Sequence, residues 1–180
     1  MFSLDKQACK LAHVNPRSEK NGKDNVLATD LKFEITSGND FLNKLHPDLQ
    51  AGLYTSQVKD PHPGHLPNLR FPFIGAVPWN KEYAGYELRV DHGIDENDPI
   101  VIGGCIVNNF KIEAQEGGTV VVDVRVQCHP DEDTIGMLCG LIQHECQISL
   151  VPPASGFTLD VTPADAKQTP GQAANAAFES

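Results

Sequence analysis

Residues 30–37, DLKFEITS, alternate strictly between apolar and polar side chains. Because the side chains of a strand point alternately to its two faces, Leu31, Phe33 and Ile35 share one face, and the pattern predicts a half-buried β-strand. A similar alternation after Trp79 predicts another strand, whose inward residues are Tyr86, Leu88 and Val90. The aromatic residues around Trp79 are expected to close the core.

A β-hairpin is predicted over residues 109–128. NFKIEAQ and TVVVDVRVQC alternate on the two sides of EGG, and glycine tolerates the positive φ that such a turn needs. The inward face of this hairpin is expected to hold Phe110, Ile112, Ala114, Val120, Val122, Val124, Val126 and Cys128. Two further patterns predict an N-terminal strand at ACKLAHV, with a tight polar turn at SEKNGKDN, and an edge strand at GFTLDVT.

Two short helices are predicted after the first alternating strand. FLNKL follows SGND, which offers Asn39 or Asp40 as an N-cap, and HPDLQAGLY follows with a kink at Pro47. The next stretch, residues 55–68, contains three prolines and is expected to be a long surface loop.

Three cysteines between residues 128 and 146 raise the question of a metal site. A third helix, with Asp131 or Asp133 as its cap, is predicted to carry Cys139 on an apolar stripe shared with Ile135, Leu138 and Ile142. The strand ECQISLVP then turns Cys146 to the same face as Ile148 and Leu150, and the hairpin register turns Cys128 inward. We therefore expect all three to face the core as reduced thiols, because the spacing C-x10-C-x6-C lacks the short ligand pairs of structural zinc.

The predicted fold class is α+β, a single domain dominated by antiparallel β-sheet with two or three short helices. The chain of 180 residues is 40% hydrophobic, which suits one core. We place this domain at residues 1–162, and we expect residues 163–180 to form a flexible tail because their apolar content is too low to bury.

The negative charge of the chain is concentrated in one segment. The formal net charge is −10, and residues 91–133 hold two bases and ten acids. A surface of one sign repels phosphate and attracts basic surfaces, although a solvated acidic face that only maintains solubility explains the same pattern. The candidate partner-binding residues are Asp91, Asp95, Glu96, Asp98, Glu113, Glu116, Asp131, Glu132 and Asp133.

The sequence contains other residues that could bind a metal ion, but their spacing supports such sites less well. His62 and His65 with Asp60 could bind a metal, and the acidic loops could bind a divalent cation, but the EF-hand pattern is broken at Pro99. Phosphate-binding, dinucleotide-binding and hydrolase motifs are absent. We therefore predict a non-enzymatic protein with no catalytic residues, no cofactor and no metal.

The charge pattern near the N-terminus bears on nucleic-acid binding and on location. The bases there are interleaved with acids, which disfavours direct nucleic-acid binding; they are Lys6, Lys10, Arg17, Lys20 and Lys23. The sequence has no long apolar run and no leader-like start, so we expect a soluble cytoplasmic protein without membrane contact. Nothing in the sequence indicates an oligomeric state.

Several short motifs carry a resemblance to a known group of proteins. LRFP at 69–72, the Pro-Trp and Gly-Tyr pairs at 78–79 and 85–86, EGGTV at 116–120 and the closing helix and strand resemble small uncharacterised early-gene proteins of tailed phages and prophages. The likeness covers residues 30–152 and transfers no catalytic residue. It implies a bacterial host cell and a setting among recombination accessories, replication accessories and inhibitors of host defence.

Three functional hypotheses follow. The leading one is a binding protein whose acidic surface engages a basic groove of a nucleic-acid-processing or antiviral defence complex, as a DNA mimic or an anti-CRISPR-like inhibitor would. The second is a single-stranded-DNA-binding or recombination and replication accessory that uses the basic N-terminus and the aromatics around Trp79. The third is a metal-dependent enzyme built on the His and Cys clusters.

Overall fold

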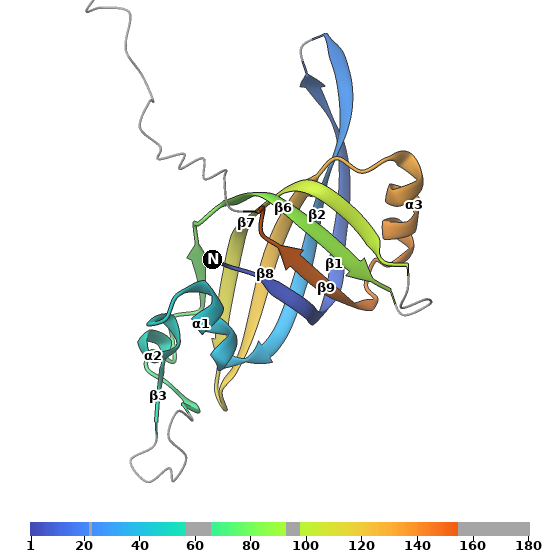
Figure 1. The fold of residues 1–180 in the computed structure, drawn as a ribbon. Coiled ribbons are helices and arrows are strands. Elements are labelled where there is room, and N and C mark those ends of the chain that lie inside the picture. The colour runs from blue at the N-terminus through green and yellow to red at the C-terminus, as the bar shows by residue number, and fades with distance from the viewer. Residues whose placement is uncertain (22, 57–65, 93–97, 155–180) are drawn as a thin grey trace, which may run out of the picture.

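The chain forms a closed antiparallel β-barrel (Figure 1). The computed structural model describes residues 1–21, 23–56, 66–92 and 98–154. Within these residues, six strands pair in the ring β6-β9-β1-β2-β8-β7, and β7 pairs with both β8 and β6 to close it. The ring strands are β1 (Leu4–Asn21), β2 (Asp24–Gly38), β6 (Tyr83–Asp91), β7 (Ile100–Gln115), β8 (Thr119–Cys128) and β9 (Glu145–Val151). The prediction of a β-dominated antiparallel domain with few short helices is confirmed, whereas closure into a barrel was not predicted.

Alternation along the strands fills the barrel as predicted. The inward residues of β2 and β8 lie opposite one another, with Phe33 beside Val124 and Ile35 beside Val122, and all four are at most 1% exposed. Tyr86, Leu88 and Val90 of β6 are buried as well. The β7–β8 turn contains two glycines at positive φ, Gly117 at 84° and Gly118 at 82°, as the EGG pattern predicted.

The β1–β2 hairpin is much longer than the sequence predicted. Most of SEKNGKDN lies in the two strands, so the expected polar turn is confined to the residues between β1 and β2. β9 stops pairing with β1 at Lys10 and β8 stops pairing with β2 at Thr29, so the outer half of the hairpin projects from the barrel as a two-stranded ribbon (Figure 1). The guanidinium of Arg17 holds the base of this ribbon through ion pairs with Asp30 and Glu19.

Three short helical turns cover one end of the barrel. They are η1 (Asn39–Phe41), α1 (Leu42–Leu45) and α2 (Leu49–Leu53). The predicted cap by Asn39 or Asp40 is wrong: Gly38 occupies the N-cap without a side-chain cap. Asn39 is buried instead, and its amide group donates to the Leu66 carbonyl at 2.7 Å and accepts from the Gln50 side chain at 2.8 Å. The side chain thus serves tertiary contacts between the helices and the segment before β4.

The segment between the helices and β6 differs in part from the predicted pattern. The pair β3 (Tyr54–Thr55) and β4 (Asn68–Leu69) joins the two ends of the predicted loop, of which residues 57–65 lie outside the described part. β5 (Ala76–Trp79) pairs with β7, and Trp79 is half-buried. Phe71 and Phe73 do not close the core as expected, because they are 55% and 100% exposed in the connection before β5.

Helix α3 (Glu132–Gly140) lies at the opposite end of the barrel from α1 (Figure 1). The predicted cap is confirmed, since the Asp131 carboxylate accepts a hydrogen bond from the Thr134 amide at 2.7 Å. The predicted burial of Cys139 is wrong: the helix rests on the barrel through Leu138, and the next residue points about 100° away, toward solvent. GFTLDVT and residues 163–180 lie outside the described residues.

Replacing Phe33 with alanine should lower the free energy of unfolding by about 3–5 kcal/mol, because it leaves a cavity inside the closed ring. Urea denaturation measures the change. Val101→Ala, at a position 52% exposed, is the matched control and should change stability by less than about 0.5 kcal/mol. Equal effects of the two substitutions would contradict a packed barrel interior.

Tyr54→Phe should destabilise the protein by about 0.5–1.5 kcal/mol, because it removes the hydrogen bonds of the Tyr54 hydroxyl to partly buried backbone groups. The Tyr54 hydroxyl donates to the Gln115 and Thr119 carbonyls and accepts from the Gln115 amide at 3.0 Å, so it fastens the helical end to the β7–β8 hairpin. Hydrogen exchange should show faster exchange at the Gln115 amide. An unchanged exchange rate there would contradict this role.

Candidate functional site

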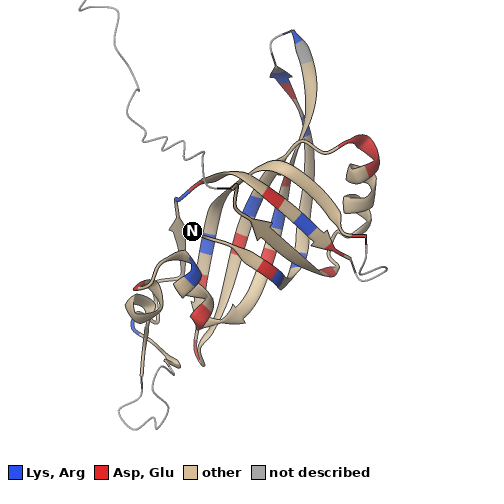
Figure 2. Ribbon diagram, viewed as in Figure 1, with Lys and Arg blue, Asp and Glu red and all other residues tan. Residues whose placement is uncertain are grey.

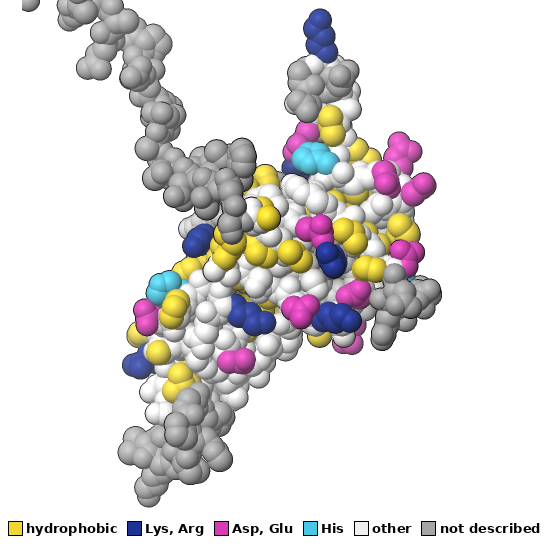
Figure 3. Space-filling model, viewed as in Figure 1, with side chains coloured by type: hydrophobic (Ala, Val, Ile, Leu, Met, Phe, Trp, Pro, Cys, Tyr) yellow, Lys and Arg dark blue, Asp and Glu magenta, His cyan; other side chains and the backbone are white. Residues whose placement is uncertain are grey.

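Acidic residues from three separate segments lie at the α3 end of the barrel. Asp91 ends β6, Asp98 precedes β7, and residues 131–133 follow β8 and begin α3. Because neighbouring strands are antiparallel, β6 ends beside the start of β7, where Val90 pairs with Ile100, and β8 ends farther along β7, where Gln127 pairs with Ile106. Figure 2 shows the acids of α3 on its first turn, and acidic side chains gather over this helix in Figure 3. We call Asp91, Asp98, Asp131, Glu132 and Asp133 the acidic end.

Two predicted residues lie elsewhere. Glu113 is near the end of β7 and Glu116 is in the β7–β8 turn, so both lie at the end covered by η1, α1 and α2. The structure therefore does not bring them together with the acidic end. Asp95 and Glu96 belong to the segment between β6 and β7 and lie outside the described residues.

The acidic end differs from the barrel wall in its ion pairs. On the wall, acids alternate with bases: Lys10 lies 3.3 Å from Glu34, and Lys32 lies 2.8 Å from Asp123. None of the five carboxylates of the acidic end forms an ion pair with another described residue. The sequence from Val126 to Ala154 contains no lysine or arginine, so the negative charge of α3 is not offset along that stretch of chain.

Local structure explains why three acids stand at the start of α3. The first turn of a helix leaves backbone amides without partners, and its dipole favours negative charge there. The hydrogen bond from the Thr134 amide holds the pKa of the Asp131 carboxyl below its usual range. Glu132 and Asp133 occupy the same first turn and are exposed. These carboxylates thus stabilise the helix and remain accessible to a partner.

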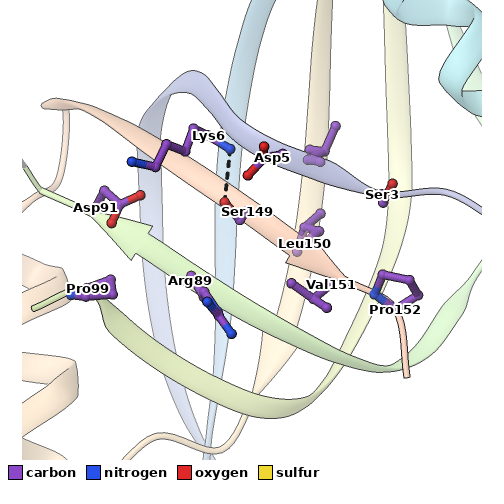
Figure 4. A pocket seen from close by; sticks show the side chains of 11 residues that line it. Ser3, Asp5, Lys6, Arg89, Asp91, Pro99, Ser149, Leu150, Val151 and Pro152 are labelled. Atoms are coloured by element: carbon purple, nitrogen blue, oxygen red, sulfur yellow. Dashed lines mark hydrogen bonds between the residues drawn. The ribbon is translucent and has the colours of Figure 1, made fainter. Parts of the chain in front are cut away.

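A cavity of about 420 Å³ borders the acidic end at Asp91 (Figure 4). It lies where the β1–β9 register shifts between Leu4 and Gln7, and Lys6 adopts a φ of 44° in this bulge. The Lys6 amide donates to the Ser149 hydroxyl at 2.9 Å, which satisfies an amide that the ladder leaves unpaired. The lining carries both signs of charge, Asp5, Lys6, Arg89 and Asp91. The cavity therefore does not extend the acidic end.

A larger cavity of about 880 Å³ lies near α1. Phe2, Leu45 and Tyr83 contribute apolar lining, and Lys44 and Lys81 contribute positive charge. It is formed by the N-terminus, α1, the start of β6 with the residues before it, and Pro153 after β9, and so lies apart from the predicted residues. Sequence reasoning missed it because its walls come from four distant segments.

The candidate metal sites find no geometric support among the described residues. There, no group of three or more His, Cys, Asp or Glu side chains could hold a metal ion. The predicted His62, His65 and Asp60 lie outside those residues. Cys128 and Cys146 are buried as predicted.

Two contacts between cysteines were not foreseen. The Cys9 and Cys146 sulfurs are 3.6 Å apart. A hydrogen bond between Cys105 and Cys128, together with burial, raises the pKa of the Cys128 thiol. Alternation along the strands predicted which cysteines face inward, but only the pairing of distant strands shows which cysteines meet.

Comparison of the chain with protein-family models, with curated proteins and with solved structures gave no match in any of the three. Among the helices that the structure describes, none is both long enough and apolar enough to cross a membrane. The site must therefore be interpreted from its own residues.

The capping role of Asp131 predicts a pH dependence. A carboxyl whose pKa is lowered in the folded state stabilises the fold above its unfolded pKa, and this stabilisation disappears as the pH falls through the folded pKa. Asp131→Asn keeps a capping side chain without a titrating group. The difference in melting temperature between wild type and variant should therefore shrink between about pH 6 and pH 3. A difference that stays constant over this range would show that the Asp131 charge does not stabilise α3.

Proposed function

We propose that this protein is a non-enzymatic binding protein whose acidic end occupies a basic, nucleic-acid-binding surface of another protein or complex. The observation that carries the proposal is the placement of five carboxylates from three segments at one end of the barrel without an ion pair to another described residue. The proposed place of action is the cytoplasm of a bacterial host, in keeping with the resemblance to phage early proteins.

The scaffold suits this role physically. Asp91 stands on a barrel strand and residues 131–133 stand on a capped helix, so little conformational freedom is lost when these charges meet a partner. Carboxylates at fixed positions can replace the phosphates that a basic groove normally binds, and they repel nucleic acid itself. Such a protein would block a nucleic-acid-processing or antiviral defence complex by competition.

The two ends of the barrel allow a matched test of this proposal. Asp98→Lys with Glu132→Lys alters the acidic end, and Glu113→Lys with Glu116→Lys changes the net charge equally at the other end. In affinity capture from a nuclease-treated bacterial lysate, the first double variant should lose the partner and the second should retain it. Binding of the wild type should weaken at high salt, and duplex DNA should displace it from the partner.

Two outcomes would contradict the proposal. Equal loss of the partner with both double variants would show that net charge matters and the acidic end does not. Binding that is independent of salt and unaffected by DNA would show that the partner does not present a basic nucleic-acid site.

The second candidate is a single-stranded-DNA-binding accessory, favoured by the exposure of Phe71 and Phe73. Exposed aromatic rings can stack on unpaired bases. The same capture without nuclease distinguishes the two functions: recovery of nucleic acid by the wild type, and its loss in a Phe71→Ser, Phe73→Ser variant, would favour this alternative. The acidic end should then have no effect on recovery.

A further inference from the structure

Cys9 and Cys146 stand directly opposite each other on neighbouring antiparallel strands. Cys9 of β1 pairs with Cys146 of β9, between the pairs Ala8 with Gln147 and Lys10 with Glu145. The β1–β9 ladder is regular over this stretch, since its register shift occurs before Gln7. The two cysteines therefore share one face of the sheet.

The side chains meet inside the barrel wall. The two sulfurs are 3.6 Å apart, and each residue is 7% exposed. Opposite residues of an antiparallel pair have Cα atoms about 4.5–5.5 Å apart, within the range of about 4.4–6.8 Å found across disulfides. Side-chain rotation is thus enough to bring the sulfurs to bonding distance, without a change of strand register.

The other two buried cysteines, Cys105 and Cys128, also form a hydrogen bond with each other, but each thiol in addition lies against a backbone carbonyl. The Cys105 thiol donates to the Ile102 carbonyl at 3.2 Å, and the Cys128 thiol contacts the Thr29 carbonyl at 3.6 Å. Cys139 is exposed on α3. The contact between the sulfurs of Cys9 and Cys146 thus joins two thiols at matched positions of one ladder.

We propose that Cys9 and Cys146 form a cross-strand disulfide by exchange with a small disulfide such as glutathione disulfide. The Cys146 thiolate attacks one sulfur of the small disulfide and releases one thiolate. Cys9 then loses its proton and attacks the Cys146 sulfur of the mixed disulfide, which releases the second thiolate. The two cysteine protons pass to the two released thiolates and convert them to thiols, so the protein dithiol is oxidised and the small disulfide is reduced.

The contact also favours Cys146 as the first nucleophile. The two sulfurs share a hydrogen bond in which either thiol can be the donor; this bond, with burial, raises the pKa of Cys9, and the bond lowers the pKa of Cys146. Cys146 is the second residue of β9, directly after the turn that follows α3. Cys146, whose thiolate forms more readily, thus stands at the beginning of its strand, where fraying would expose it to the small disulfide.

The proposed bond would join the N-terminal and C-terminal strands of the barrel. The two cysteines are 137 residues apart, so the disulfide closes a loop that contains the other ring strands. Closing a loop of this length restricts the unfolded chain strongly. This inference does not depend on the proposed function of the acidic end.

The test uses the full chain with Cys139→Ser, which removes the exposed thiol that would link two molecules. After incubation with glutathione disulfide and blocking of free thiols, cleavage after basic residues releases Gln7–Lys10, and cleavage after glutamate separates Cys128 from Cys146. Mass spectrometry should find Gln7–Lys10 joined to the peptide that begins at Cys146. The melting temperature should rise by roughly 5 °C or more and return after reduction.

Matched single variants complete the test. Cys146→Ser should abolish both the bridged peptide and the thermal shift, whereas Cys105→Ser should retain the bridge. The proposal is overturned if, after incubation of the folded protein with glutathione disulfide, Cys9 and Cys146 are both found fully alkylated. It is also overturned if they carry only glutathione. Mass spectrometry of the Cys139→Ser chain decides the question even where a second substitution prevents folding.

Discussion

The pairing of β7 with β8 is the constraint on which the rest of the structure depends. Without it the sheet would present open strands on both sides, and open strands expose unpaired amides and carbonyls. Closure lets Phe33, Val124 and their neighbours face a common interior instead of one side of a flat sheet. It also fixes which strand ends lie together, and so it gathers Asp91, Asp98 and the start of α3 at one end.

The inward faces of β2, β6 and β8 could be predicted because a barrel interior demands an alternation of period two. The closure of the barrel could not be predicted, because it needs β1 to pair with β9, which is distant in the sequence, and no local pattern indicates this pairing. The first part of β7 was missed because Gly103 and Gly104 interrupt its alternation. Cys139 was misplaced because α3 is buried only at Leu138, and the next residue lies about 100° around the helix from it.

The candidate site was predictable in composition but not in extent. The density of acids between residues 91 and 133 was evident, and the cap at Asp131 followed from its chemistry. What the sequence could not show is that β7, about 50 Å long if extended, carries Glu113 and Glu116 away from Asp98. Residues close in sequence were therefore separated, while β6 and α3 brought distant ones together.

The projecting β1–β2 ribbon has a consequence for how the molecule comes apart. From Arg17 to Asn21 and from Asp24 to Ala28, the two strands of the ribbon pair with each other and with no other described strand, and two isolated strands are barely stable in water. The ribbon can therefore separate at its tip while the barrel stays closed. The ion pairs of Arg17, together with the contact between His129 and Glu19 at 3.3 Å, hold the base of the ribbon and so separate this local opening from the cooperative unit of the fold.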